Sequence, residues 1–238
     1  MTIQYDGSDF HGWQVQAEGR TIQGDIETAL SVIYPEEKIN LIGSGRTDAG
    51  VHALGQVAHF DMEPDMDNCE LRDALNGNLP DDCCVNLVEV TDSDFHARFS
   101  AQRRDYFYSC RKDRYLLDRN TVWYTGNLDL SKLNNAAKIV IGEHDFLSFS
   151  KKNLDIENTN CTIFQSQWTE SSKIVNYYVS ANRFLHHMVR YLVGTMVAIS
   201  HGNYTMKEFK DLLNHPKHDV HIYRAPACGL VLDHVSYE

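Results

Sequence analysis

A glycine-rich loop in the first half of the chain carries a carboxylate and a guanidinium two residues apart. Residues 43–52 (GSGRTDAGVH) place three glycines around Arg46 and Asp48. Glycines allow positive φ angles and a close approach of the backbone to a ligand. The loop lacks the Gly-Lys-Ser/Thr of a phosphate loop and the spacing of a dinucleotide fold. Asp48 is therefore a candidate catalytic carboxylate, although spacing alone favours an aspartate that hydrogen-bonds its own turn.

A second candidate is the aromatic run at residues 106–108 (YFY). On a strand, Tyr106 and Tyr108 lie on one face and Phe107 on the other. Either face is compatible with a hydrophobic core. The functional alternative is stacking on a nucleobase, which is worth about 1–3 kcal/mol per base.

A third candidate is Arg190, on a predicted helix over residues 184–200. One side of that helix is an apolar stripe, which should face the core. Arg190 lies on the other side, and so does Gly194. A glycine inside a helix costs about 1 kcal/mol relative to alanine, so Gly194 indicates that something approaches the backbone there. The alternative is an ordinary solvated face, and its remaining members are Arg183, His186 and His187.

Histidines and cysteines give weaker signals. His11, His52 and His59, with Asp9 or Asp48, would be the ligands of a metal-dependent hydrolase, but no ligand-spaced motif is present. Histidines that pack in the core or support other side chains are more probable on spacing. The six cysteines include no C-x-x-C pair, which argues against a zinc ribbon or a disulfide framework.

The elements that must position these residues alternate between strands and helices. The sequence predicts two α+β units, residues 1–100 and 101–238, with helices on one face of an antiparallel sheet. Thr21 is a plausible N-cap for the first helix. Predicted strands span residues 2–5, 40–42, 56–62, 85–90, 106–110, 161–169, 174–181 and 230–235. The other predicted helices begin at residues 70, 130 and 184.

Charge is unevenly spread along the 238 residues. The net charge is −11, and residues 1–100 hold 19 acidic and only 5 basic side chains. Such a field repels polyanions, so a nucleic-acid partner requires a local basic surface. The best candidate is the arginine-rich segment from Arg98 to Arg119. The sequence also lacks a membrane-spanning apolar run and a signal peptide, and we expect a cytosolic location.

Residues 45–53 (GRTDAGVHA) and 55–60 (GQVAHF) resemble the signature of the TruA family of tRNA pseudouridine synthases. Further segments agree in order and spacing, so the resemblance covers almost the whole chain. They are residues 5–14 (YDGSDFHGWQ), 94–101 (DFHARFSA), 144–146 (HDF), 184–190 (FLHHMVR) and 225–230 (APACGL).

The resemblance implies the roles of the site residues. Asp48 corresponds to the essential carboxylate, Tyr106 to the active-site tyrosine and Arg190 to the arginine that pairs with the aspartate. Arg46 corresponds to the arginine of the same motif and is expected to fill the space left by an everted nucleotide. We expect the remaining contacts with RNA from His52, Arg98, Arg103, Arg104, Arg183 and His186.

The family's fold and reaction complete the expectation. The resemblance implies two ferredoxin-like halves that share a continuous antiparallel sheet, and a homodimer that modifies uridines 38–40 in the tRNA anticodon stem-loop. The rearrangement breaks C1′–N1 and joins C1′ to C5 without redox change, so no cofactor and no metal are expected. A catalytically silent RNA-binding relative is the main alternative, and a metal-dependent hydrolase ranks far lower.

Overall fold

The computed structural model describes residues 1–63, 65–151 and 158–238, and they form two compact units. The first unit comprises residues 1–102 and 231–238, and the second comprises residues 103–230. The last strand of the chain therefore belongs to the first unit, whereas the sequence division kept residues 101–238 together.

The sheet of the first unit has the strand order β4–β1–β3–β10. Strands β1 and β3 are antiparallel, and so are β1 and β4. Strand β10 runs parallel to β3, with Val231 opposite His52. The strands are β1 (Thr2–Tyr5), β3 (His52–His59), β4 (Cys83–Leu87) and β10 (Leu230–Ser236), and the short β2 (Ile42–Gly43) pairs with β3. A 3₁₀ turn, η1 (Gly7–Asp9), follows β1.

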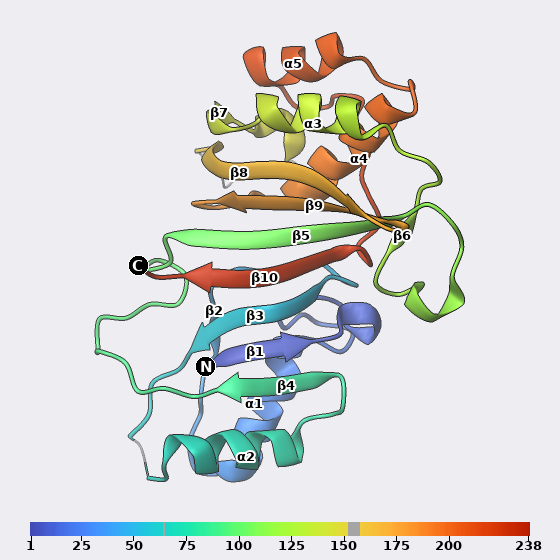
Figure 1. The fold of residues 1–238 in the computed structure, drawn as a ribbon. Coiled ribbons are helices and arrows are strands. Elements are labelled where there is room, and N and C mark those ends of the chain that lie inside the picture. Colours follow the sequence, from blue (N-terminus) through green and yellow to red (C-terminus); the bar gives the residue numbers. More distant parts are fainter. Residues whose placement is uncertain (64, 152–157) are drawn as a thin grey trace. The chain divides into compact units, whose positions relative to one another are not determined.

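Two capped helices complete the first unit (Figure 1). Helix α1 (Ile22–Ile33) begins after Thr21, whose hydroxyl accepts a hydrogen bond from the amide of Gly24, as predicted. Helix α2 (Asn68–Asn78) begins with a capping box between Asp67 and Glu70. The periodic apolar positions of the two helices are buried, because they face the sheet. They include Ile22, Ile26, Leu30, Leu71 and Leu75.

The sheet of the second unit has the strand order β5–β9–β8–β7, with antiparallel neighbours throughout. In β9, Tyr177 and Val179 are buried whereas Tyr178 is 37 % exposed, which is the alternation of a sheet covered on one face. The strands are β5 (Arg103–Arg111), β7 (Gly142–Asp145), β8 (Asn160–Ser171) and β9 (Ile174–Ala181). The short β6 (Trp123–Tyr124) runs parallel to β5, and two 3₁₀ turns are η2 (Leu116–Asp118) and η3 (Leu147–Phe149).

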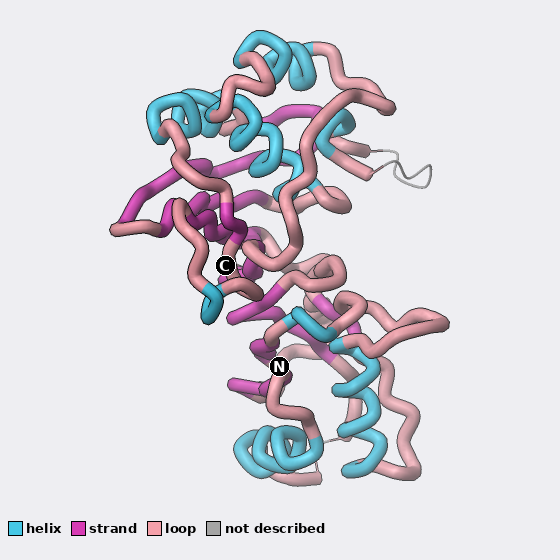
Figure 2. The backbone as a smooth tube through the Cα atoms, turned by 90° about the vertical axis from the view of Figure 1, so that its right-hand side faces the viewer, coloured by secondary structure: helices cyan, strands magenta, loops and turns pink. Residues whose placement is uncertain are grey.

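The described residues of the second unit include helices α3 (Leu130–Ile139), α4 (Met188–Ser200) and α5 (Met206–Asn214), which Figure 1 labels; helices are cyan in Figure 2. The indole of Trp168 on β8 donates to the sulfur of Met196 on α4 at 3.3 Å. This contact places α4 on the face of the sheet that buries Trp168. Helix α5 was not predicted, although Thr205 and Glu208 form a capping box that the sequence displays.

The start of α4 corrects one prediction. The apolar stripe is buried as expected, but the helix begins at Met188 rather than at residue 184. His187 precedes it in a left-handed conformation, with φ of 66°. Arg183 and His186 therefore do not share a helix face with Arg190, because the chain has not yet entered the helix at these two residues.

Together the elements form a mixed α+β structure with mostly antiparallel strand pairing, as the sequence predicted. No helix among the described residues is long and apolar enough to span a bilayer.

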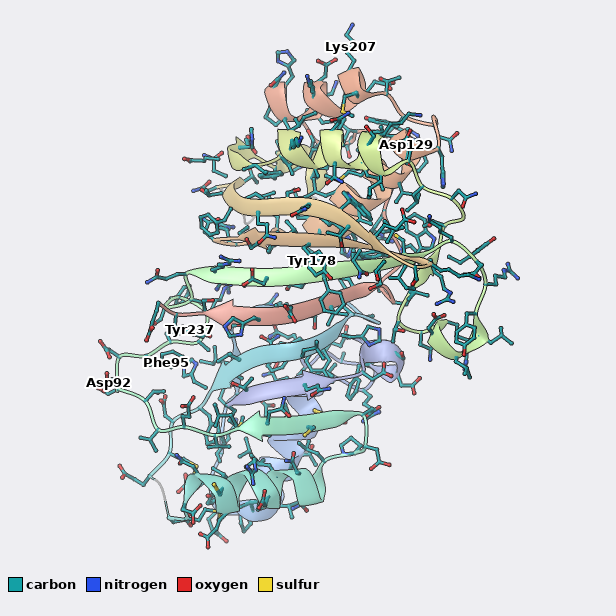
Figure 3. The ribbon with its side chains drawn as sticks, in the orientation of Figure 1. Asp92, Phe95, Asp129, Tyr178, Lys207 and Tyr237 are labelled. Carbon is teal, nitrogen blue, oxygen red and sulfur yellow. The ribbon has the colours of Figure 1, made fainter. Side chains whose placement is uncertain are left out.

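A histidine ties the segment before residue 100 to the first sheet. The Nδ1 of His59, at the end of β3, accepts a hydrogen bond from the amide of Ala97 at 3.1 Å. The hydroxyl of Tyr237 donates to the carbonyl of Ala97 at 2.8 Å, and its ring lies beside Phe95 (Figure 3). Burial, and next the nearby His96, lower the pKa of His59, while Asp61 opposes the shift.

This arrangement predicts a loss of stability in mild acid. The neutral form of His59 is favoured in the folded state, so the unfolded chain binds more protons below its pKa of about 6.5. The free energy of unfolding should therefore fall as the pH is lowered from about 6.5 towards 5. His59→Asn, whose amide oxygen can replace the ring acceptor, should flatten this dependence in urea titrations. His215→Asn, at an exposed histidine, is the control. An unchanged slope for His59→Asn would show that His59 is not the group responsible.

Candidate active site

The turn that carries Asp48 is held by the backbone of another loop. Trp13 donates its amide to the carbonyl of Thr47 at 3.1 Å, and the hydroxyls of Tyr5 and Thr47 are 2.8 Å apart. Gly12 has φ of 94°, and a Cβ added there would lie 2.7 Å from the carbonyl oxygen of Thr47. Only glycine allows this approach. The residues before and after Gly12 therefore set the position of the Asp48 turn.

The other end of the loop is fixed by a buried amide. Gln56 on β3 accepts a hydrogen bond from the hydroxyl of Ser44 at 2.7 Å and donates to the carbonyl of Gly45 at 3.0 Å. The backbone carbonyl of Asp48 accepts a hydrogen bond from the amide of Val51 at 3.1 Å, and the Asp48 side chain is half-buried. Arg46 is exposed. The loop thus has a rigid backbone and presents a carboxylate near its surface.

His52, which we expected from the sequence to contact RNA, has a buried environment in the first unit. It is 6 % exposed, and its Nδ1 accepts the amide of Gly7 at 3.1 Å. The same nitrogen lies 3.0 Å from Asp6. Burial raises the pKa of Asp6, but hydrogen bonds from the hydroxyl and the amide of Ser8 lower it, and the net result is a pKa below the usual value. His52 therefore joins β3 to η1.

Tyr106 lies on β5 in the second unit, opposite Val179 of β9. Its ring is half-exposed and meets the ring of Phe184 edge to face, with 5.2 Å between centroids. Tyr108 on the same face is fully buried and donates to the carbonyl of Pro226 at 3.0 Å. The two tyrosines thus differ: Tyr108 belongs to the core, and Tyr106 keeps an accessible ring.

Arg190 lies in the first turn of α4, and its Nε donates to the carbonyl of Ala225 at 2.9 Å. The amide of Ala225 in turn donates to the carbonyl of Arg190 at 3.0 Å. Burial raises the pKa of Tyr108 far above its ordinary value, and the charge of Arg190 opposes this shift. The Arg190 guanidinium is therefore close to the buried Tyr108 and to the segment that follows residue 222.

Several predicted RNA contacts are engaged within their own unit. Arg103 forms a salt bridge with Asp105 at 2.7 Å, and Arg104 donates to the carbonyl of Asn182 at 2.6 Å. Arg111 binds both Asp113 and Asp118, and Lys112 pairs with Glu170. The positive charge of Arg103 and Arg111 is thus largely balanced, and the basic segment from Arg98 to Arg119 is less available than its composition suggested.

The residues before α4 include one contact that sequence reasoning missed. The imidazole rings of His186 and His187 lie 4.1 Å apart, and Arg183 is half-exposed. Arg224, which no motif singled out, lies with its Nη1 3.0 Å from Nδ1 of His187. Arg98, in the first unit, is exposed and lies over the ring of Phe99.

The histidines proposed for a metal-dependent hydrolase do not assemble. Among the described residues, no three of His11, His52, His59, Asp9 and Asp48 bring their ligand atoms within 4.8 Å of one another. His52 and His59 each accept a backbone amide on Nδ1. The positions of these side chains in the first unit therefore do not support a metal-dependent hydrolase.

Comparison with known proteins decides the family. The family model described as tRNA pseudouridine synthase matches residues 1–100 and 136–238. The chain belongs to the tRNA pseudouridine synthase family. The predicted resemblance and the predicted enzyme class, an isomerase, are thereby confirmed.

Curated relatives match over the full length. The tRNA pseudouridine synthase A of Chlorobium limicola is 40 % identical over 237 residues, covering 99 % of this chain and 97 % of the relative. Those of Anoxybacillus flavithermus and Bacillus subtilis are each 36 % identical over 241 residues, covering 100 % of this chain and 97 % and 98 % of the relatives. A chain in the crystal structure of a Cbf5–Nop10–Gar1 complex aligns with a TM-score of 0.41 and 10 % identity, over 96 % of this chain and 56 % of that chain.

The contact at Gly12 predicts a loss of synthase activity. Gly12→Ala should push Thr47 away, and a displacement of about 1 Å at a reacting group can cost about 10²-fold in rate. Pseudouridine formation, measured on a tRNA transcript, should fall by about that factor.

The matched control is Gly202→Ala. Gly202 also has a positive φ, 79°, but no atom lies within 4 Å of an added Cβ. Both variants should lose stability through backbone strain, whereas only Gly12→Ala should lose activity. Equal activities would contradict the positioning role of Gly12.

Proposed function

We propose that this chain isomerises uridine to pseudouridine at positions 38–40 of the tRNA anticodon stem-loop. The family membership supports the reaction, and the relatives named above are tRNA pseudouridine synthases. The observation that carries the assignment to a site is the loop of Asp48. It is held by the backbone near Gly12 and by the side-chain amide of Gln56, and the Asp48 side chain is half-buried.

The chemistry requires an anion near the sugar. Breaking the C1′–N1 bond develops positive charge on the ribose, and a nearby carboxylate stabilises that charge or adds to it. The uracil then turns and C5 bonds to C1′. C5 loses its proton, and N1, which kept the electrons of the broken bond, takes one up. Asp48 is our candidate for the carboxylate. Attack on the sugar, attack on uracil C6 and removal of a sugar proton all need it ionised.

Tyr106 and Arg190 complete the proposed catalytic set. The half-exposed ring of Tyr106 is suited to stack on the uracil, and its hydroxyl is a candidate acceptor for the C5 proton. A guanidinium beside a carboxylate favours the charged form of the acid. We propose this role for Arg190, as the family resemblance implies. Eversion of the nucleotide costs a few kcal/mol and leaves a gap between the neighbouring bases. The exposed Arg46 would fill that gap.

Binding of RNA needs positive charge that is not already balanced. Arg114 and Arg119 flank the turn η2, where Leu116 and Leu117 are 76 % and 82 % exposed. Both arginines are exposed; Arg114 lies over the ring of Tyr124, and Arg119 donates to a carbonyl. We propose that these two arginines, rather than Arg103 and Arg111, supply phosphate contacts from this segment, together with Arg183 and His186.

The finer architecture and assembly are also proposals. The order β4–β1–β3 around α1 and α2 supports a ferredoxin-like first half. Trp168 pairs with the buried Tyr177, so the exposed Tyr178 lies on the other face of the second sheet, and Phe164 is also exposed. Such uncovered aromatics are compatible with the homodimer that the resemblance implies.

Tritium release tests the proposed activity. Wild-type protein should release tritium from tRNA that carries [5-³H]uridine, and Asp48→Asn should release none while retaining tRNA affinity. Replacement of uridines 38–40 by cytidine should remove the wild-type signal. Binding without release in the wild-type protein would indicate a catalytically silent RNA-binding relative instead.

Salt dependence tests the proposed RNA contacts. The double variant Arg114→Gln/Arg119→Gln should weaken tRNA binding and reduce the slope of log K against log salt by about 1.5, because two phosphate contacts are lost. Lys207→Gln/Lys210→Gln, which removes equal charge from the exposed side of α5, is the control (Figure 3). Equal slopes in the two double variants would exclude the contacts at η2.

A further inference from the structure

Helix α4 contains a glycine whose environment explains its presence. A Cβ added to Gly194 would lie 2.3 Å from the carbonyl oxygen of Tyr223 and 2.7 Å from the amide nitrogen of Ala225. Both atoms belong to backbone, so neither can move aside as a flexible side chain could. The segment of residues 223–225, here called the strap, therefore lies directly on the helix backbone at Gly194.

The strap is bound to α4 on both sides of this contact. The hydroxyl of Thr195 lies 3.4 Å from the amide and 3.5 Å from the carbonyl of Tyr223. At the other end, Ala225 exchanges two hydrogen bonds with Arg190: its amide donates to the Arg190 carbonyl, and its carbonyl accepts Nε. Ala225 is fully buried.

The chain beyond the strap is anchored to the sheet. Tyr108 on β5 donates its hydroxyl to the carbonyl of Pro226, and Ser109 donates its amide to the carbonyl of Gly229 at 2.9 Å. The strap is thus held between α4 and a segment fixed on β5. Its position relative to the first turn of α4 is set by backbone contacts.

The bond to Nε has a geometric consequence. The Nε–H lies in the plane of the guanidinium group, so a hydrogen bond from it limits rotation about the Cδ–Nε bond. The directions of the two Nη groups of Arg190 are then fixed as well. An arginine held in this way loses less entropy when it binds a carboxylate or phosphate than one that rotates.

We propose that the strap is a positioning element for Arg190 and that Gly194 is the residue that admits it. The strap acts through Arg190 and has no contact with the substrate in this proposal. This inference depends on the proposed activity only in the kinetic experiment that tests it.

The glycine-to-alanine substitution distinguishes a positioning role of the strap from a general effect on helix stability. Alanine is favoured over glycine inside a helix by about 1 kcal/mol, so Gly194→Ala should not weaken α4 itself. Any defect must arise from the displaced strap. Gly77 in α2 provides a matched control, because it is also helical and has no atom within 4 Å of an added Cβ.

The kinetic experiment uses the full chain and tritium-labelled tRNA. Gly194→Ala should lower kcat roughly tenfold or more, because Arg190 is no longer held in place, while KM stays within about twofold. Gly77→Ala should match wild type. The Arg190→Lys variant lacks the Nε contact. In that variant, adding Gly194→Ala should lower kcat by less than a further factor of about two. A wild-type kcat for Gly194→Ala, or losses that multiply in the double variant, would overturn the proposal.

Two further measurements cover the remaining outcomes. If Gly194→Ala does not fold, Thr195→Val, which keeps the side-chain shape but removes the hydroxyl, should give a smaller loss in kcat at unchanged KM.

If the wild-type protein proves inactive, the proposed function fails, and the strap is tested instead by the hydrogen exchange of the Arg190 side chain, measured by NMR. The Nε–H of Arg190 should exchange slowly in wild type and at least about tenfold faster in Thr195→Val or Gly194→Ala. Equal exchange rates would then refute the strap.

Discussion

Backbone packed directly against backbone is the constraint on which the candidate site depends. At Gly12 the first loop contacts the carbonyl of Thr47, and at Gly194 a distant segment contacts helix α4. In each case the residue that the contact serves, Asp48 or Arg190, is a charged side chain whose own rotamers are numerous. Fixing the main chain around such a group reduces the entropy it must lose when it meets a substrate. The glycines contribute by having no side chain.

Much of the fold follows from patterns that the sequence shows openly. The strand at residues 174–181 is predicted with correct limits, and the helix after Thr21 with its correct start, because alternation and capping are local signals. The end of α4 at Ser200 is predicted correctly, but its start is not, because Phe184 and Leu185 continue the apolar pattern although His187 adopts a left-handed conformation. A φ of 66° is uncommon for a histidine, and no local pattern in the sequence predicts it.

The candidate site shows the same division. Asp48, Tyr106 and Arg190 are found by motif, and Gly194 is found because a glycine is costly in a helix. What approaches Gly194 is not predictable from residues 188–200, since Tyr223 and Ala225 come from another part of the chain. The pairing of Arg103 with Asp105 was within reach of sequence reasoning, because residues two apart on a strand share a face. The net charge of the segment from Arg98 to Arg119 does not show that Arg103 and Asp105 neutralise each other.

Strand β10 has a consequence for how the molecule is made. Residues 231–238 complete the sheet of the first unit, next to β3, although they are synthesised after the whole of the second unit. During synthesis β3 therefore waits with one edge unpaired while more than a hundred residues are added, and an unpaired edge is a template for wrong association. Folding of the first unit is thus coupled to synthesis of the second, and a chain that stops before residue 230 has an open sheet.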